Sequence, residues 1–310
     1  MNNDSSIKIE GLSKSFGDVL AVDGLTLDIK KGELFGLVGP DGAGKTTTLR
    51  LLAAILEPSA GEAWVTGYSI KSDGERIKEH IGYMPQRFGL YEDLTVIENI
   101  NFYADIYEVT KKERAERIEK LLGFSNLTPF KDRLAGKLSG GMKQKLGLAC
   151  ALIHTPKVLL LDEPTNGVDP VSRRDFWRIL YGLLKEGITI LVSTAYLDEA
   201  ERSTRVGLIH KGKLLTTEEP DKLKKSLGYP MYELWLDDAR SSSEFVSKIE
   251  GVVSVSIYGD KLHMAIAKRE SLDAIIAKIK SNGAEVKSLR EILPSLEDIF
   301  ITRVNEYERK

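Results

Sequence analysis

The chain has 310 residues, of which 42% are hydrophobic and 29% charged, with a formal net charge of −2 at pH 7. This length supports a substantial core and two domains, and the balanced charge argues against a dedicated nucleic-acid-binding protein. No apolar run reaches the roughly 20 residues that a membrane-spanning helix needs, and the start lacks the pattern of a signal peptide. Cys150, in an apolar run, predicts a buried thiol in a reducing compartment. We therefore expect a soluble cytoplasmic protein.

The first part of the chain is predicted to be an α/β domain over residues 1–220. Residues 7–29 alternate apolar and polar side chains around a Gly-Asp break, which predicts short antiparallel strands. Residues 32–40 predict a buried strand that enters a glycine-rich turn, and a helix follows. Further strands are expected at 62–66, 81–84, 158–161, 188–192 and 206–210, with a mostly helical stretch at 95–124. Strands that alternate with helices predict a mainly parallel sheet.

A change in composition after Pro220 indicates a second, smaller domain over residues 221–310. Its patterns follow the order strand, helix, strand, strand, helix, strand, and a final helix. This order is typical of a ferredoxin-like α+β module. The segments are YELWL, SSEFVSKIE, VVSVSIY, KLHMAIA, SLDAIIAKIK, AEVKSL and SLEDIFITRV.

A phosphate-binding loop is predicted at residues 39–46, where GPDGAGKT fits the pattern G-x-x-x-x-G-K-[ST]. Glycines let backbone N–H groups turn inward around phosphate oxygens, and the helix that follows adds the positive end of its dipole. Lys45 is expected to reach the β- and γ-phosphates, and the Thr46 hydroxyl to ligate Mg²⁺. A chance glycine turn is the alternative, but the loop has the required strand before it and helix after it. The predicted nucleotide-contacting residues here are Gly39, Pro40, Asp41, Gly42, Ala43, Gly44, Lys45, Thr46 and Thr47.

An acidic pair, Asp162 and Glu163, ends the apolar strand in VLLLDEP. Asp162 is predicted to hold Mg²⁺ through water, because this ion keeps much of its hydration shell. Glu163 is predicted to orient or deprotonate the attacking water. Such a pair alone is usually a solvated turn, but together with the phosphate loop it predicts phosphoryl chemistry.

The segment LSGGMKQ at residues 138–144 identifies the class of nucleotide hydrolase. It resembles the LSGGQ signature of ATP-binding cassette (ABC) ATPases, and it lies between the phosphate loop and the acidic strand as in that family. The resemblance implies a P-loop fold with a RecA-like core, an antiparallel β subdomain and a helical subdomain. It also implies that Ser139, Gly140 and Gly141 complete the ATP site of a partner cassette in a head-to-tail dimer, as a homodimer or a heterodimer.

Other positions match the ABC family one by one. Phe16 resembles the aromatic residue that stacks on adenine, although a core phenylalanine is the alternative. Gln86 resembles the glutamine that touches Mg²⁺ and the attacking water, and Asp169 resembles the aspartate that couples the two sites of the dimer. Residues 88–104 resemble the segment that docks on transmembrane partners.

The tail narrows the resemblance to exporters. PSLEDIF at residues 294–300 is similar to the closing segment of ABC-2-type exporter ATPases, and the cassette motifs are similar to the YbhF group of efflux ATPases. The resemblance implies ATP and Mg²⁺ as cofactors and ABC-2-type permease subunits as partners. It places the protein on the inner face of the cell membrane and leaves the cargo unspecified. A soluble ABC protein that acts on ribosomes or DNA is a competing hypothesis, but paired cassettes and inserted coiled coils are not seen.

One family feature is missing: ABC ATPases usually carry a switch histidine where this chain has Ala195. Tyr196 is expected to point away from the position that the imidazole would take. His154 is interpreted as structural, and His80, His210 and His263 as solvated surface residues. Three outcomes stay open: slow hydrolysis, pairing with a different cassette, or a non-catalytic regulatory cassette. Reduced but real hydrolysis is favoured because Glu163 is present.

Overall fold

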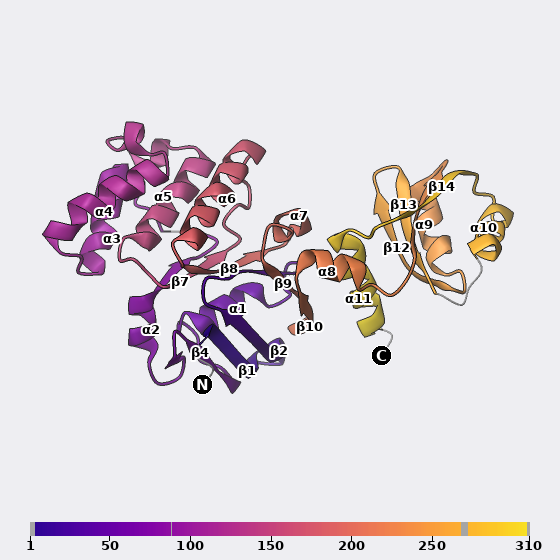
Figure 1. Ribbon diagram of the computed structural model, residues 1–310, viewed down its shortest axis with the longest axis horizontal. Helices are drawn as coiled ribbons and strands as arrows, with labels where there is room; N and C mark the ends of the chain where they lie inside the picture. Colours follow the sequence, from indigo (N-terminus) through magenta and orange to yellow (C-terminus); the bar gives the residue numbers. More distant parts are fainter. Residues whose placement is uncertain (1–3, 88, 268–271, 309–310) are drawn as a thin grey trace. The chain divides into compact units, whose positions relative to one another are not determined.

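The computed structural model describes residues 4–87, 89–267 and 272–308. It divides into two compact units, the first comprising Met1–Tyr196 with Ile209–Leu214 and the second Leu197–Leu208 with Leu215–Lys310. Most elements of both units are labelled in Figure 1. Each described helix is too short or too polar to span a lipid bilayer.

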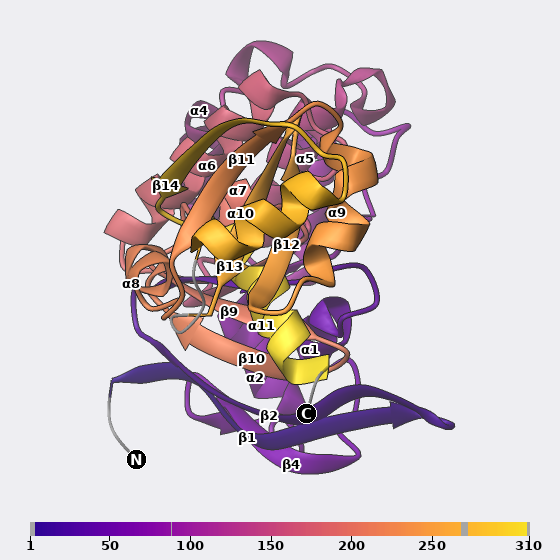
Figure 2. The same cartoon turned by 90° about the vertical axis from the view of Figure 1, so that its right-hand side faces the viewer.

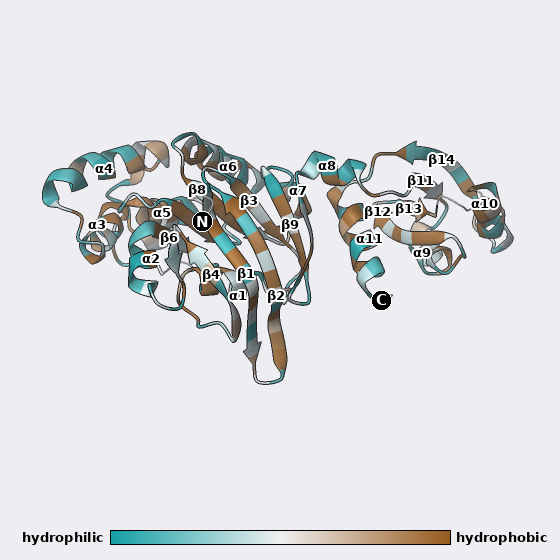
Figure 3. Cartoon of the chain, turned by 60° about the horizontal axis from the view of Figure 1, so that its bottom comes forward, coloured by the Kyte–Doolittle hydropathy of each residue, from teal (hydrophilic) through white to brown (hydrophobic). Residues whose placement is uncertain are grey.

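An antiparallel sheet with the order β2-β1-β4-β5 forms one layer of the first unit. Its long hairpin consists of β1 (Ser5–Phe16) and β2 (Val19–Lys30), joined at the predicted Gly-Asp break, and it is longer than the short strands expected. The sheet is completed by β4 (Ala60–Val65) and the short β5 (Tyr68–Ser69). Apolar and polar residues alternate along β1 and β2, visible as bands of both colours in Figure 3, so one face is buried and the other faces solvent.

The central sheet has the order β10-β9-β3-β8-β7-β6. Its strands are β3 (Leu34–Val38), β6 (Ile81–Met84), β7 (Val158–Asp162), β8 (Thr189–Thr194), β9 (Arg205–His210) and β10 (Lys213–Glu218). The pairs β3–β8, β8–β7 and β7–β6 are parallel, and every residue of β3, β7 and β8 is buried. Strands covered on both faces need continuous apolar sequence, which is why the aliphatic runs predicted them. The mainly parallel sheet is therefore confirmed.

Helices of the first unit cover the sheet and build a helical region. They are α1 (Lys45–Leu52), α2 (Gly74–His80), α3 (Val96–Ile106), α4 (Lys111–Phe124), α5 (Gly140–Leu152) and α6 (Pro170–Lys185), with short 3₁₀ turns at Thr128–Phe130 and Ala135–Lys137. The stretch predicted as mostly helical is two helices, because Glu108 adopts a left-handed φ of 52° and Thr110 caps a new helix. A capping box of Thr95 and Glu98 starts α3.

The second unit contains the predicted ferredoxin-like module. After α7 (Leu197–Ala200) and α8 (Pro220–Lys225) come β11 (Met231–Leu236), α9 (Ala239–Ser247), β12 (Val252–Tyr258), β13 (Lys261–Ile266), α10 (Leu272–Ser281), β14 (Val286–Ile292) and α11 (Leu296–Glu308). The sheet order is β12-β13-β11-β14, with antiparallel neighbours throughout. A core of Leu234, Val246, Met264 and Ile275 joins α9 and α10 to one face (Figure 2). Ser271, where the α10 pattern begins, lies outside the described residues.

The prediction that His263 is a solvated surface residue is wrong. It lies on β13 and is only 7% exposed, with its Nδ1 3.0 Å from Asp298 Oδ2 of α11. The helix α11 lies against β12, where Thr302 Oγ1 is 2.7 Å from Ser254 Oγ, and it covers part of the sheet face opposite the apolar core. A strand pattern alone did not reveal that a helix 35 positions later along the chain covers this face.

Candidate nucleotide site

The predicted phosphate loop connects β3 to α1 at the carboxyl end of the parallel sheet. The Gly39 N–H donates to the carbonyl oxygen of Thr194 at 3.3 Å, which joins the loop to the end of β8. Gly44 has a φ of 103°, and a Cβ there would lie 2.4 Å from the carbonyl oxygen of Ala21. Only glycine fits at this position. The tight turn that it allows leaves backbone N–H groups available at the start of α1.

The Lys45 side chain is buried at the centre of the loop. Its Nζ donates to the carbonyl oxygens of Gly39 at 2.8 Å and Pro40 at 3.1 Å, and it lies 3.1 Å from Glu163 Oε1. The side chains of Lys45 and Glu163 are only 4% and 10% exposed. Buried charges need partners, and here the cation and the carboxylate come from the two motifs that the sequence predicted to work together.

Thr46 and Asp162 form a site that suits a small divalent cation. The Thr46 hydroxyl donates to Asp162 Oδ1 at 3.0 Å, and the Ser193 hydroxyl donates to the same oxygen at 2.7 Å. Asp162 Oδ2 is buried and has no hydrogen-bond partner among the described residues. A buried carboxylate oxygen left without a donor is costly, and hydroxyl and carboxylate oxygens are the ligands that Mg²⁺ prefers. The residues present therefore fit Mg²⁺.

Glu163 is held in an uncommon backbone conformation. Its φ is 48°, in the left-handed region, which non-glycine residues seldom adopt. Its N–H donates to both the carbonyl and the hydroxyl oxygen of Ser193 at 3.1 Å. Gln86 Nε2 donates to Glu163 Oε2 at 3.0 Å, and Asn166 Nδ2 donates to the same oxygen at 3.2 Å. Hydrogen bonds from the Glu163 N–H and to its carboxylate thus hold this residue in a backbone conformation that is intrinsically unfavourable.

The remaining sites lie apart from this cluster. Phe16 is at the end of β1 and 49% exposed, with the Lys14 ammonium 5.2 Å from its ring centroid, so it is a surface residue rather than a core one. Ser139 accepts from the Met142 N–H and caps α5, while Asp169 accepts from two N–H groups and caps α6. Hydrogen bonds from Ser172 lower the pKa of Asp169.

The glycines of the LSGGMKQ segment differ in their surroundings. Gly140 is exposed, and a Cβ added there would meet no atom within 4 Å. Gly141 is buried, and a Cβ there would lie 2.4 Å from Ser172 Cβ, so it allows α5 and α6 to approach closely. Among the described residues, the segment is exposed at Ser139 and Gly140, as a surface that meets a second cassette needs to be.

The segment predicted to dock on membrane partners is ordered by internal contacts. Asn99 is fully buried in α3, and its amide donates to the Tyr91 carbonyl at 3.0 Å and accepts from the Tyr91 N–H at 2.9 Å. The Tyr91 side chain remains 48% exposed. Phe88, the first residue of the segment, lies outside the described residues.

Two residues of the cluster, Ser193 and Asn166, were not among the predicted site residues. Ser193 is the second-last residue of β8, next to β7, with Asp162 as its cross-strand neighbour. Asn166 follows Glu163 by three residues in a turn closed by a hydrogen bond from the Asn166 N–H to the Glu163 carbonyl at 3.1 Å. Polar side chains at or shortly after the ends of buried strands were the signal in the sequence, because carboxyl ends of parallel strands meet at one edge.

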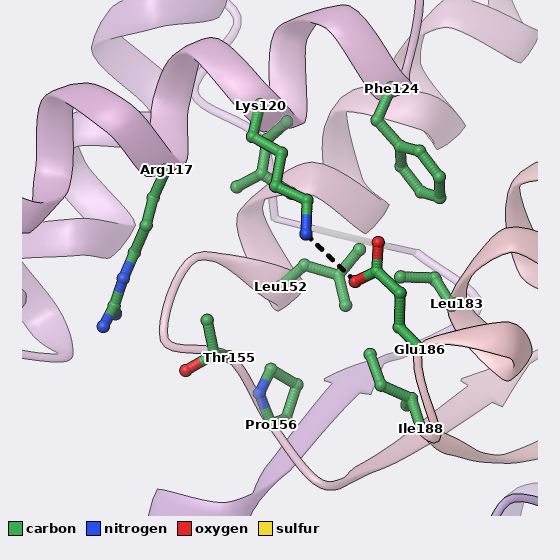
Figure 4. Close-up of a pocket in the computed structure, with 10 residues that line it drawn as sticks. Arg117, Lys120, Phe124, Leu152, Thr155, Pro156, Leu183, Glu186 and Ile188 are labelled. Atoms are coloured by element: carbon green, nitrogen blue, oxygen red, sulfur yellow. Dashed lines mark hydrogen bonds and ion pairs between the residues drawn. The ribbon is translucent and has the colours of Figure 1, made fainter.

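A separate cavity of about 270 Å³ lies between α4, the end of α5 and the end of α6 (Figure 4). Its walls are mainly apolar, and an ion pair between Lys120 Nζ and Glu186 Oε2, 3.1 Å apart, crosses its rim. Within the described part of the chain, its lining includes none of the predicted nucleotide-contacting residues. The cavity is therefore distinct from the phosphate loop. The lining residues are Arg117, Lys120, Leu121, Phe124, Leu152, Thr155, Pro156, Leu183, Glu186 and Ile188.

The parallel sheet, the loop at its carboxyl edge and the paired acidic residues define a P-loop nucleotide-binding protein. Comparison with protein families agrees: residues 22–166 match the ABC transporter family, and residues 219–304 match the C-terminal domain of ATP-binding proteins like DrrA1-3. The chain is 34% identical over 302 residues to the daunorubicin/doxorubicin resistance ATP-binding protein DrrA of Streptomyces peucetius, covering 96% of this chain and 91% of DrrA. The chain belongs to the family of ABC transporter ATP-binding proteins.

Other relatives extend this assignment. The chain is 46% identical over 304 residues to the probable multidrug ABC transporter ATP-binding protein YbhF of Escherichia coli (strain K12). That match covers 96% of this chain but 52% of YbhF, so the chain spans about half the length of this relative. A dimeric structure of the ATP-binding cassette MJ0796, in a post-hydrolysis state with ADP and Pi, superposes with a TM-score of 0.63 at 26% identity. It covers 69% of this chain and 98% of that one.

Proposed function

We propose that the protein binds and hydrolyses MgATP as the energy-coupling subunit of an ABC-2-type membrane exporter. The observation that carries the proposal is the convergence of Lys45, Asp162 and Glu163 at one edge of the sheet, with a buried carboxylate oxygen suited to a cation. Membership of the ABC family and the similarity to drug-export ATP-binding proteins support it.

The proposed mechanism assigns a role to each polar group of the cluster. Backbone N–H groups within residues 41–46 bind the β- and γ-phosphates, and Lys45 contributes its charge there. Thr46 and Asp162 would hold Mg²⁺, and the bound ion would neutralise charge on the phosphates. Glu163 accepts a proton from the attacking water, and Gln86 orients the Glu163 carboxylate through its hydrogen bond and would contact Mg²⁺. The exposed Phe16 ring stacks on adenine.

A head-to-tail dimer of cassettes is the proposed working form. Ser139, Gly140 and Gly141 would contact the γ-phosphate held by the partner's phosphate loop, and Asp169 would couple the two sites. The exposure of Ser139, Gly140 and Asp169 is compatible with this role, and the similar cassette MJ0796 is a dimer. The partner is a second cassette, identical to this chain or different from it.

The remaining assignments concern the membrane partners, the cellular location and the domains of the protein. ABC-2-type permease subunits would dock near residues 88–104, and the protein would lie on the cytoplasmic face of the cell membrane. Residues 1–220 are proposed as the ATPase domain and residues 221–310 as an accessory domain. The cargo belongs to the permease subunits, whose substrate contacts are not part of this chain.

A second candidate function is a slow or regulatory cassette in a heteromeric transporter. Ala195 favours it, because an alanine cannot form the γ-phosphate contact that the switch histidine provides in the family. The chain would then supply one weak site opposite a stronger one. We favour slow hydrolysis over none because Glu163 is present and held by three side chains.

Phosphate release from the purified protein tests the proposal. With MgATP, the wild type should exceed Glu163→Gln by about 100-fold, because the variant loses the general base but keeps the phosphate loop. Binding of a fluorescent ATP analogue should be similar in both proteins. Equal rates at assay background, with ATP still bound, would replace hydrolysis by the regulatory function. Loss of ATP binding in both would contradict the nucleotide site itself.

A further inference from the structure

We propose that Asn166 is a positioning residue for hydrolysis, held in place by Tyr196, and that the two partly replace the missing switch histidine. The inference rests on the proposed ATPase function and concerns the same site. It assigns roles to residues that the motif comparison leaves without one.

The Asn166 amide lies directly against the proposed general base. Its Nδ2 donates to Glu163 Oε2 at 3.2 Å, while Gln86 Nε2 donates to the same oxygen at 3.0 Å. The other oxygen, Oε1, faces Lys45 Nζ at 3.1 Å. Rotation of the carboxylate about its terminal bond would break all three contacts, so Asn166 helps to fix the direction in which Glu163 presents its lone pairs.

The Tyr196 hydroxyl lies at the oxygen end of the Asn166 amide. It is 3.5 Å from Asn166 Oδ1, a long contact in which the hydroxyl is the donor, and the amide nitrogen is directed at Glu163. A flipped amide would place a carbonyl oxygen against the Glu163 carboxylate, a repulsive contact. A donor at the oxygen end therefore favours the orientation that supports the base.

The Tyr196 ring is itself held. The Arg173 guanidinium, from the first turn of α6, lies 4.8 Å from the ring centroid, and the Tyr196 N–H donates to Thr194 Oγ1 at 3.0 Å. The expectation that Tyr196 points away from the position of the imidazole stays a prediction, while its hydroxyl lies near Asn166. β8 ends at Thr194, so strand alternation no longer sets the direction of residue 196.

The positions of Asn166 and Tyr196 next to Ala195 and Glu163 explain why these two residues can replace part of the contribution of the histidine. Ala195 follows β8 immediately and precedes Tyr196, and Tyr196, Asn166 and Glu163 form a continuous polar path beside it. A preorganised donor at a catalytic carboxylate stabilises the productive arrangement without a charge of its own. Asn166 and Tyr196 do not themselves contact the γ-phosphate, so the replacement is partial.

Steady-state phosphate release with MgATP tests the proposal in the full chain. Asn166→Ala should lower kcat about 10-fold and leave KM for ATP within about twofold, because a positioning contact acts on the chemical step. Tyr196→Phe should lower kcat about two- to fivefold, since the amide loses its orienting donor but keeps its own contact. Asn282→Ala is the matched control, because this asparagine also donates through its amide but to a helix carbonyl in the second unit.

A double-mutant cycle separates positioning from general structure. In an Ala195→His background, Asn166→Ala should lower kcat by less than about threefold, because the imidazole would then supply part of the stabilisation that Asn166 provides. A purely structural role would give the same loss in both backgrounds, together with a lower thermal midpoint, and would overturn the proposal. If the wild type exceeds Glu163→Gln but Asn166→Ala matches the wild type, only the positioning role fails. If the wild type itself matches Glu163→Gln, the ATPase function fails with it.

Discussion

The two units each bury an aspartate that accepts hydrogen bonds from neighbouring side chains, and the two aspartates differ in which carboxylate oxygens have a partner. In the first unit, Asp162 Oδ1 accepts from the Thr46 and Ser193 hydroxyls, and its Oδ2 has no hydrogen-bond partner among the described residues. In the second unit, Asp298 accepts hydrogen bonds at both oxygens, from His263, Ser256 and Ser295. Both carboxylates are at most 2% exposed.

In the second unit, the protein's own groups satisfy both oxygens of Asp298, whereas the buried His263 Nε2 has no hydrogen-bond partner among the described residues. Ser295 and Asp298 cap the start of α11, and His263 and Ser256 join that cap to the sheet. Glu233 lies 3.7 Å from His263 on the same face, and a hydrogen bond from the Arg290 guanidinium lowers the pKa of Glu233 to about 2. A buried carboxylate whose two oxygens both accept hydrogen bonds from the protein stabilises the fold. A buried carboxylate with one unpaired oxygen points to a ligand.

Replacing each aspartate by asparagine is expected to give the largest difference between the two units. Asp162→Asn should lower turnover by about 100-fold or more with little change in thermal midpoint, because the cation loses a charged ligand. Asp298→Asn should keep turnover within about threefold but cost on the order of 3 kcal/mol in stability, because His263 and the cap of α11 lose their charged partner. Phosphate release and thermal unfolding measure the two effects. Similar loss of turnover in both variants would contradict the distinction.

A smaller effect is expected from Ser193→Ala. The hydroxyl donates to Asp162 and accepts from the Glu163 N–H, so its loss frees both the metal ligand and the base. We predict a roughly 10-fold lower kcat and a higher Mg²⁺ requirement. Ser193→Thr, which keeps the hydroxyl, should recover part of the loss. A Mg²⁺ titration unchanged from that of the wild type would show that Ser193 does not position the metal ligand.

The second unit should respond to pH through His263. The hydrogen bond that His263 donates to Asp298 raises the pKa of His263, although burial opposes the shift and the Glu233 charge adds to it. A raised folded-state pKa means that this stability is complete below the unfolded pKa of about 6.5 and is lost as pH rises through the folded value. Burial works to raise the pKa of Asp298, but hydrogen bonds from His263, Ser256 and Ser295 lower it, so its contribution is lost only in acid.

Thermal unfolding of the full chain between pH 6 and pH 9 checks this dependence. The wild type should lose stability toward pH 9, and His263→Gln should lose less over the same range, because glutamine does not titrate. Lys261 and Tyr258, which lie beside His263, stay unchanged in both proteins. If the thermal midpoints of the two proteins changed in parallel with pH, His263 would not be the source of the pH dependence.

The smallest predicted effect concerns the ion pair at the rim of the cavity in Figure 4. Lys120 and Glu186 are 66% and 46% exposed, so solvent screens their attraction. Lys120→Ala should change stability by about 0–0.5 kcal/mol and leave turnover unchanged. Urea denaturation measures the change. A loss above about 1 kcal/mol would show that exposed and buried ion pairs differ less here than the comparison assumes.

Most of the fold could be predicted from the sequence where a strong period or a fixed motif was present. The aliphatic strands, the phosphate loop and the ferredoxin-like order are examples, because continuous apolar runs and glycine spacing report directly on burial and backbone shape. The strands β5 and β10 and the helices α2 and α8 were not predicted, since they are short, polar or only partly buried. Such elements depend on neighbours rather than on their own pattern.

The candidate site shows the same division. Lys45, Asp162, Glu163 and Gln86 were predicted because each belongs to a motif with a chemical requirement, and the structure brings them together. Asn166 was not predicted, because its role depends on a tyrosine 30 residues later in the chain. His263 was misplaced for a similar reason, since its burial comes from α11. Contacts between distant segments are invisible to local patterns.

We propose that Ala195 is a single local weakness in an otherwise complete ATP-hydrolysing site. The decisive measurement is the steady-state rate of phosphate release for Ala195→His beside the wild type with saturating MgATP. Because Ala195 is exposed and the surrounding groups are in place, the added imidazole should raise kcat by about 10-fold. An unchanged or lower rate, with ATP binding intact, would contradict the claim and mean that the site works with a different geometry.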